Sequence, residues 1–492
     1  MSLKSKAISG VKWTTISTVV IVAFQTLQLV FLARLLDTAS FGLIGMVTVI
    51  TALSEIFMDL GISNAIIQRK SVTPKDLNAL YWFNIVAGIA ISLIIFITAP
   101  LIAAVFKQNE LLPLTRLISV IYLIVPFGQL YKAMLQKELK FNSITKAESA
   151  SVIVGTLVTL FFAYTGHGVI SIIYGQIIAA SLKTFLYNLY GRNFFKPLFF
   201  FRFKHVKEYL KFGLYQAGES LTNYVNTNID TLSIGKLLGA SALGLYNLAF
   251  NIVIIPSTKI NPIITRVLFP VFSKIQDQNE KLKAGFYKLL TIVGLINFPL
   301  FFGLFVTAPT FVLVVFGSKW MDSVPLLRLL CGVGLLRSIG NPVGSLLMAK
   351  GLINRSFRFN LFKMIFQIPG IIIGAYFGGS VGVAAVFLTL QLFYTYFSYS
   401  YLIKAAIGSS LPEYLLSLRL PLLLSLPMAA GIWIIQILNS ELLSTRLGLA
   451  VQIVAGVIIY STLLLIIKHP LIEELKSMFL KKFGRLHLNT SA

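Results

Sequence analysis

The chain has 492 residues, of which 57% are hydrophobic and 12% are charged, and its mean hydropathy is +0.84. This composition excludes an ordinary soluble domain and predicts a polytopic helical membrane protein. The net charge of +25 does not indicate nucleic-acid binding, because the cations are dispersed in short loops and form no single basic face. The single cysteine, Cys331, excludes an internal disulfide, and the four scattered histidines indicate no metal site. We expect no metal, no cofactor and no nucleic-acid partner.

Fourteen apolar segments are long enough to span a membrane as helices. Their expected limits are 11–33, 41–62, 79–106, 114–136, 146–166, 168–190, 213–236, 241–265, 287–316, 324–349, 358–377, 381–403, 414–438 and 446–467. The predicted fold class is therefore an all-α polytopic membrane protein with about 14 transmembrane helices.

The distribution of Lys and Arg orients these helices. When each cation is assigned to the nearer helix end, only seven of the 42 fall at connections from odd to even helices, and three, Lys183, Lys259 and Arg337, lie deep inside expected helices. The other 32 occupy the termini and the connections from even to odd helices. Because short cytoplasmic loops are enriched in Lys and Arg, the pattern predicts that both termini are cytoplasmic.

An internal repeat divides the chain. The segment LARLLDTASFGLIGM, starting at Leu32, aligns with SIGKLLGASALGLYNL, starting at Ser233, so that Gly42 meets Gly244 at an offset of 202. Because six spans separate the copies, helices 1–6 and 7–12 are expected to be parallel repeats, which rock about a substrate site near the membrane midplane.

The repeat predicts four regions. Residues 1–195 form an N-terminal six-helix lobe, and residues 196–405 form a C-terminal six-helix lobe that begins with an interfacial connector at 196–212. Residues 406–468 hold helices 13 and 14, and residues 469–492 form an amphipathic cytoplasmic tail. The connector and the tail mix aromatic or aliphatic residues with Lys and Arg, so we expect both to lie along the anionic inner leaflet.

The expected helix at 213–236 carries an unusual polar face. Glu219, Asn223, Asn226 and Asp230 follow one another at spacings of 4, 3 and 4, which place them on one side of a helix. Charged and amide groups are costly in contact with lipid, so this face is expected to look into protein or water. Polar contacts between packed helices are the alternative, but two acids in one column favour a hydrophilic cavity.

Arg337 is the cation that lies nearest the middle of an expected helix, and Asn341 follows it one turn later. We expect Arg337 to face the cavity and bind an anionic substrate group. The alternative is a structural ion pair with Asp230 or Glu219.

Two further cavity candidates are Asn251, whose amide suits hydroxyl groups, and Lys259, in the inner half of helix 8. Lys259 has an equally good alternative, because a long side chain can extend to the inner membrane interface.

Glu55 and Asp59, one turn apart at the inner end of helix 2, are candidates for coupling transport to a proton or Na⁺. Ion pairs with Arg69 or Lys70 of the following loop would explain them equally well.

Several segments carry a family resemblance. The opening SLKSKAISGVKW, the segment DLGISNAIIQRK from Asp59, NPIITRVLFPVFSKIQD from Asn261 and LLRSIGNPVGSLLMAK from Leu335 resemble Wzx-type polysaccharide flippases, in particular the O-antigen and colanic acid exporters, of the multidrug/oligosaccharidyl-lipid/polysaccharide exporter superfamily.

This resemblance implies a non-enzymatic exporter in the bacterial cytoplasmic membrane. It implies transport of a polyprenyl-diphosphate-linked oligosaccharide by alternating access, for surface polysaccharide biosynthesis. The implied partners are this lipid-linked substrate and membrane lipid, with a polysaccharide polymerase and a chain-length regulator as further candidates.

Two other functions are alternatives to this one. A multidrug or cation-coupled exporter of the same superfamily commonly needs a carboxylate in the first lobe, and the expected helix 11–33 has none. A membrane polysaccharide polymerase or ligase generally has a large outer loop with catalytic groups, whereas every expected outer connection here is short.

Overall fold

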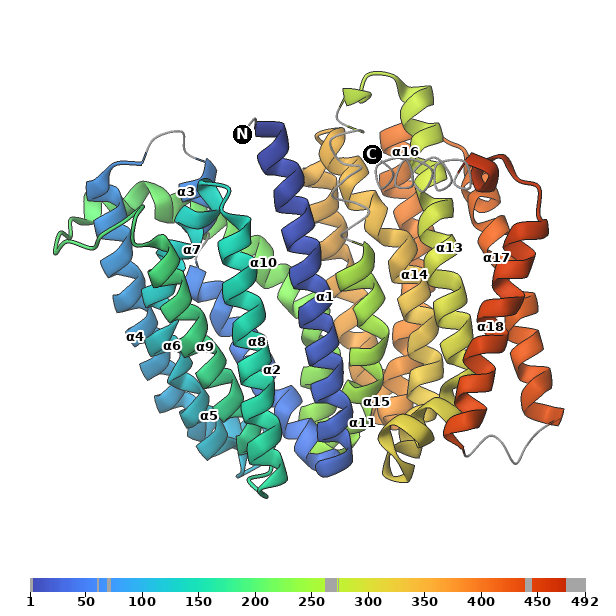
Figure 1. Ribbon diagram of the computed structural model, residues 1–492, viewed down its shortest axis with the longest axis horizontal. Coiled ribbons are helices and arrows are strands. Elements are labelled where there is room, and N and C mark those ends of the chain that lie inside the picture. Colours follow the sequence, from blue (N-terminus) through green and yellow to red (C-terminus); the bar gives the residue numbers. More distant parts are fainter. Residues whose placement is uncertain are drawn as a thin grey trace, which may run out of the picture. The chain divides into compact units, whose positions relative to one another are not determined.

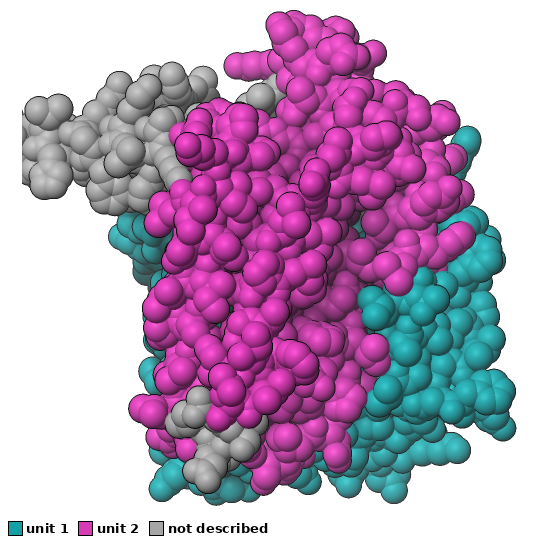
Figure 2. Space-filling view, turned by 90° about the vertical axis from the view of Figure 1, so that its right-hand side faces the viewer, with its two compact units in different colours: residues 1–252, 357–390 teal, residues 253–356, 391–492 magenta. Residues whose placement is uncertain are grey.

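The computed structural model describes residues 3–474 apart from 60–61, 69–71, 262–271, 273 and 439–444. Every regular element in this part of the chain is a helix (Figure 1). The chain divides into two compact units, residues 1–252 with 357–390 and residues 253–356 with 391–492 (Figure 2). The lobe boundaries expected from the sequence stay a prediction.

The first unit contains the N-terminal helices. These are α1 (Leu3–Leu35), α2 (Thr38–Asp59), α3 (Ile62–Gln68), α4 (Pro74–Phe106), α5 (Leu111–Ser119), α6 (Ile121–Ile124), α7 (Pro126–Lys137), α8 (Phe141–Tyr164), α9 (Ile170–Gly191), α10 (Phe203–Leu237), most of α11 (Gly239–Ile255) and the middle of α15 (Ile353–Ser398). Helices α8 and α9 approach closely where Gly155 faces Gly175, because a Cβ added at Gly175 would lie 2.6 Å from the Gly155 carbonyl oxygen.

The second unit contains the remaining helices and the ends of α15. Its elements are the π-helical turn η1 (Pro256–Ile260), α13 (Asn279–Phe311), η2 (Val312–Phe316), the 3₁₀ turn η3 (Ser318–Ser323), α14 (Val324–Ala349), η4 (Tyr399–Ile403), α16 (Lys404–Ile407), α17 (Leu411–Leu438) and α18 (Arg446–Ile466). Helices α17 and α18 correspond to the expected helices 13 and 14. They pack on α13, where Tyr460 of α18 donates a hydrogen bond to the Leu295 carbonyl at 2.7 Å.

Eleven of the described helices are long and apolar enough to cross a membrane, or twelve if the bent pair Leu111–Ile124 and Pro126–Lys137 forms one crossing. The 49° bend in this pair falls at Pro126, which lacks the backbone N–H that would continue the hydrogen-bond ladder. The expectation of an all-α polytopic membrane protein is confirmed.

Helix α15 has 46 residues but turns back on itself. Gly379 adopts φ 59° and ψ −147°, a conformation that residues with a Cβ rarely adopt. The two halves then lie against each other, since a Cβ added at Gly382 would stand 2.2 Å from the Gly374 carbonyl oxygen. The segment is therefore a helical hairpin, as the separate expected helices 358–377 and 381–403 require.

Helix α10 is longer than expected. It begins at Phe203, inside the expected connector, and runs without a break to Leu237. The sequence from Lys204 to Phe212 contains no Gly or Pro, so nothing ends the helix before residue 213. Residues 192–202 remain as the non-helical link to α9.

Candidate functional site

The polar column on α10 lies in the first unit and becomes more buried along the helix. Asn223 is exposed, Asn226 is 6% exposed and Asp230 is only 1% exposed. Glu219 belongs to α10, but its side chain lies outside the described residues. The sequence thus correctly placed Asn226 and Asp230 on an inward-facing side of one helix.

Asp230 is held by hydrogen bonds. Its carboxylate accepts a hydrogen bond from the Tyr246 hydroxyl at 2.6 Å and one from the Thr231 backbone N–H at 2.8 Å. Tyr246 lies on α11 and is fully buried. A buried carboxylate needs such donors, because its desolvation is otherwise costly.

Asn226 connects α10 to the first half of α15. Its Nδ2 donates to the Asn360 carbonyl at 3.0 Å, and Gln367 Nε2 donates to the Asn226 carbonyl at 2.7 Å. The Oδ1 of Asn226 is buried and has no hydrogen-bond partner among the described residues. A buried acceptor in this state is unusual, and it leaves an oxygen one turn from Asp230 with unused hydrogen-bonding capacity.

The other candidates are divided between the units. Asn251 is an exposed residue of α11 in the first unit. In the second unit, Arg337 is half-buried in α14, and Asn341 Nδ2 donates to the Ser257 carbonyl of η1 at 2.9 Å. Lys259 belongs to η1, but its side chain lies outside the described residues.

Two buried asparagines that connect α13 with α14 were missed by the sequence reasoning. Asn297 of α13 donates to Asn261 Oδ1 at 2.9 Å, and Asn261 Nδ2 lies 3.4 Å from the Ser338 carbonyl of α14. Both asparagines are 0% exposed. The signal in the sequence that could have identified them is an amide residue within an apolar segment, as at Asn226.

A charged cluster joins four helices of the first unit. Lys132 of α7 pairs with Glu148 of α8 at 3.1 Å, and Tyr187 of α9 donates to the same carboxylate at 3.0 Å. Glu55 of α2 interacts electrostatically with Lys132 and with Lys183 of α9. Glu55 thus has cationic neighbours within the first unit, from helices that the sequence reasoning did not connect with it.

Two residues of the following loop, Arg69 and Lys70, are the alternative ion-pair partners of Glu55 and Asp59. Arg69 and Lys70, and the side chain of Asp59, lie outside the described residues. The ion-coupling role of Glu55 and Asp59 stays a prediction.

The two repeats contact each other through equivalent positions. A Cβ added at Gly42 of α2 would lie 1.8 Å from the Ala240 carbonyl oxygen of α11, and one added at Gly244 would lie 1.8 Å from the Thr38 carbonyl oxygen. The repeat offset of 202 relates Gly42 to Gly244 and Thr38 to Ala240. The contact is therefore reciprocal, as across a local two-fold axis, and only glycine fits at its centre.

Amide and carboxylate oxygens of this kind recognise hydroxyl groups, and a guanidinium binds phosphate oxygens in a bidentate manner. Among the described residues, no group of three or more His, Cys, Asp or Glu is placed to hold a metal ion. The arrangement suits binding of a polar substrate within a membrane-embedded helical protein.

Comparisons of the sequence with known proteins find similarity to proteins of polysaccharide biosynthesis. The family model described as "Polysaccharide biosynthesis protein" matches residues 31–325. The chain is 43% identical over 479 residues to the lipopolysaccharide biosynthesis protein WzxC of Escherichia coli K12, covering 97% of each chain. It is 33% identical over 486 residues to the teichuronic acid biosynthesis protein TuaB of Bacillus subtilis 168, covering 99% of each.

Solved structures show the same fold at low sequence identity. The lipid II flippase MurJ in an inward closed conformation superposes with a TM-score of 0.75 at 17% identity, covering 92% of this chain and 97% of that one. An inward-facing multidrug resistance MATE family transporter superposes with a TM-score of 0.60 at 15% identity, covering 79% of this chain and 98% of that one.

Proposed function

Because the chain belongs to the polysaccharide biosynthesis protein family of flippases and exporters, we propose that it moves a polyprenyl-diphosphate-linked oligosaccharide across the bacterial cytoplasmic membrane. The column of Asn226 and Asp230 on α10 is the observation that carries this proposal. These residues place a carboxylate and an unpartnered amide oxygen inside a membrane protein, where sugar hydroxyls would find hydrogen-bonding partners.

We infer 14 crossings with both termini in the cytoplasm. Counting the α15 hairpin as two crossings, the bent α5–α7 segment as one and α10 as one raises the eleven apolar helices to fourteen. Helix α10 is not apolar enough to be counted by hydropathy, but its 35 residues extend about 52 Å, well beyond a hydrocarbon thickness of about 30 Å. The alternation of loop cations supports the orientation.

We propose that Arg337 binds the diphosphate and that Asn223, Asn226, Asp230, Asn251 and Asn341 contact sugar hydroxyls. Glu219 and Lys259 stay candidate substrate contacts. A diphosphate cannot enter hydrocarbon without a charged partner, and arginine offers the bidentate geometry that phosphate oxygens accept. The buried asparagines Asn261 and Asn297, which reach the Ser338 carbonyl, would fix the position of α14.

Alternating access is supported by the reciprocal contact of Gly42 and Gly244. On the proposed orientation, α2 and α11 both begin at the outer side of the membrane, so this contact lies on the outer side of the proposed transporter. At Gly42 and Gly244 the two helices meet through backbone atoms, and we propose that this contact opens and closes during transport.

The drug-exporter alternative is less well supported. Helix α1 carries no carboxylate, and the cluster around Glu55 and Glu148 contains Lys132 and Lys183 as well. A polymerase or ligase is not supported, since the relatives and structural neighbours are not described as enzymes of that kind.

The genetic test is deletion of the gene and analysis of lipid-linked intermediates. We expect the repeat unit to accumulate on the inner leaflet and surface polymer to be lost. Repeat units that reached the outer leaflet but stayed unpolymerised would instead indicate a polymerase. Fusion reporters after Lys107 and Lys236 should read outside and those after Lys140 and Lys204 inside; an inverted pair would overturn the topology.

A further inference from the structure

The link at residues 192–202, which joins the two repeats, is hydrogen-bonded to the start of α4. Asn78 Oδ1 accepts a hydrogen bond from the Leu198 N–H at 2.5 Å, and Trp82 Nε1 donates to the Leu198 carbonyl at 3.0 Å. Asn78 and Trp82 lie one turn apart on α4, so together they satisfy both backbone polar groups of Leu198. The backbone of the link is thereby fixed at its centre.

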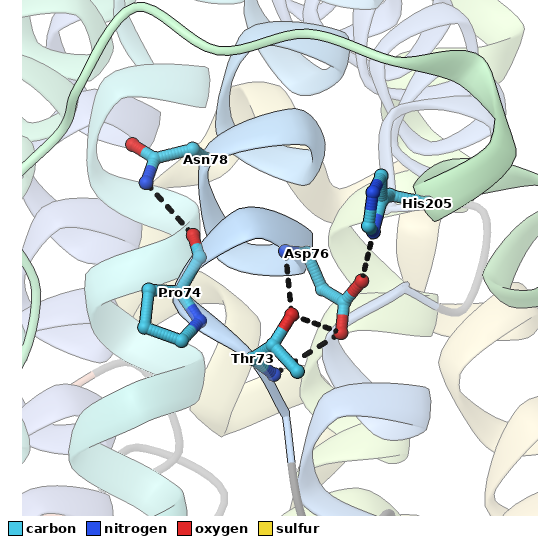
Figure 3. A network of polar contacts seen from close by, with 5 residues as sticks. All are labelled: Thr73, Pro74, Asp76, Asn78 and His205. Carbon is cyan, nitrogen blue, oxygen red and sulfur yellow. Dashed lines mark hydrogen bonds and ion pairs between the residues drawn. The ribbon is translucent and has the colours of Figure 1, made fainter.

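A second attachment lies at the start of α10 (Figure 3). His205 Nδ1 is 2.6 Å from Asp76 Oδ1, while Asp76 also accepts hydrogen bonds from the N–H and hydroxyl of Thr73 in a capping box. The buried side chains of Phe195, Val206 and Tyr209 belong to the core of the first unit. The link is therefore attached to the first unit both at Leu198 and at the start of α10.

Although its backbone is fixed by these hydrogen bonds, the link has large apolar side chains that are exposed. Leu198 is 68% exposed and Phe199 is 89% exposed, although the Phe199 ring contacts the edge of Trp82 at a centroid distance of 5.2 Å. Phe201 and Phe203 are 49% and 56% exposed. An ordered segment that holds four apolar side chains outward indicates a partner for them.

Cations surround these side chains. Arg192, Lys196, Arg202, Lys204 and Lys207 are all exposed, and Glu208 is the only acid in residues 192–208. We call the exposed side chains of residues 192–207 the connector surface. Apolar rings set among cations are typical of segments that lie at an anionic membrane interface.

The position of the connector surface beside α4 favours lipid over a soluble protein as its partner. Trp82 begins a stripe that continues along one face of α4 through Val86, Ile89, Leu93 and Ile97, which are 45–70% exposed. This apolar stripe faces lipid in a membrane-spanning helix, and tryptophan is enriched where such a face meets the headgroups. The connector surface therefore lies at headgroup level.

We propose that the connector surface is a binding site for anionic phospholipid headgroups, which anchors the link between the repeats. The cations bind phosphate and the phenylalanines enter the acyl-chain boundary. Because the link continues without a break into α10, bound lipid would fix the start of the helix that carries Asn226 and Asp230.

The test uses the full-length protein in vesicles of phosphatidylcholine and phosphatidylglycerol mixed in known proportion. A photo-crosslinking phenylalanine analogue replaces Phe199, and in a control protein it replaces Phe377, which is 83% exposed on the α15 hairpin. We expect crosslinks at Phe199 to contain more phosphatidylglycerol than the bulk mixture, and those at Phe377 to match the mixture. Bulk composition at both positions, or crosslinks to protein, would overturn the proposal.

A charge variant provides the second measurement. Replacing Lys196, Arg202, Lys204 and Lys207 with Gln should abolish the phosphatidylglycerol enrichment at Phe199, since each cation contributes about fivefold in affinity for an anionic surface. The matched control replaces Lys140, Lys146, Lys274 and Lys281, which are also exposed, with Gln. An equal loss of enrichment in both variants would show a general charge effect and refute a specific site.

Discussion

Replacing Gly42 with Ala should weaken the contact between α2 and α11 by a calculable amount. The new Cβ would stand 1.8 Å from the Ala240 carbonyl oxygen, whereas such contacts essentially never fall below 3.0 Å, so the helices must separate locally by at least 1.2 Å. Overpacking of this kind costs about 1–3 kcal/mol. If only the outward-closed state contains the contact, the equilibrium shifts by about 5- to 150-fold towards states in which the helices are apart.

The assay is labelling of a cysteine introduced at Asn223 by a membrane-impermeant maleimide added outside intact cells. Cys331 is the only native cysteine and is buried, so Cys331→Ser gives a suitable background. We expect faster labelling in Gly42→Ala and in its repeat equivalent Gly244→Ala. The control is Gly344→Ala in α14, where an added Cβ meets nothing within 4 Å.

The reasoning would be refuted if Gly42→Ala left labelling and abundance unchanged. A fall in abundance without faster labelling would show that the crossing is a permanent structural contact. Gly45→Ala provides an intermediate case. Its Cβ would meet the side chains of Asn247 and Leu243, which can move more easily than a backbone carbonyl, so the substitution should cost less than Gly42→Ala.

Three further changes test the site and the fold. The Arg337→Leu protein should accumulate normally but lose transport, and Arg337→Lys should keep part of the activity. If Arg337→Leu instead lowers protein abundance, and a second substitution that neutralises Asp230 or Glu219 restores both abundance and transport, Arg337 forms a structural ion pair. Tyr246→Phe should reduce transport by removing the 2.6 Å hydrogen bond to Asp230, about 1.5–3 kcal/mol for a charged acceptor, and unchanged transport and thermal stability would contradict this. Gly379→Ala should lower the thermal unfolding temperature through backbone strain of about 1–3 kcal/mol, with Gly378→Ala as control; equal stability of both would contradict a strained turn.

Local features of the chain were largely predictable from the sequence. The spacing of Asn226 and Asp230 placed them on one buried face of α10, because helical periodicity fixes which residues share a side. The turn at Gly379 was expected from an interruption between two apolar segments, and glycine there permits the positive φ.

Contacts between distant segments could not be predicted in the same way. The Lys132–Glu148 pair and the Asn261–Asn297 hydrogen bond depend on which helices become neighbours, and neither pair has a regular spacing in the sequence. The start of α10 at Phe203 was missed because basic and aromatic residues indicated an interfacial segment but not where its helix would begin. The reciprocal packing of Gly42 and Gly244 was foreshadowed by their alignment, although the alignment did not show that equivalent positions touch.

The most direct test of flipping uses purified protein in vesicles that contain a polyprenyl-diphosphate-linked oligosaccharide in both leaflets. A glycosidase added outside cleaves only the outer-leaflet substrate. If the protein flips this lipid, cleavage should rise from the outer-leaflet fraction alone towards completion, and Arg337→Leu at equal protein density should remain at the outer-leaflet fraction. Cleavage that stays at the outer-leaflet fraction with the unmodified protein, under every imposed ion gradient, would contradict the proposed function.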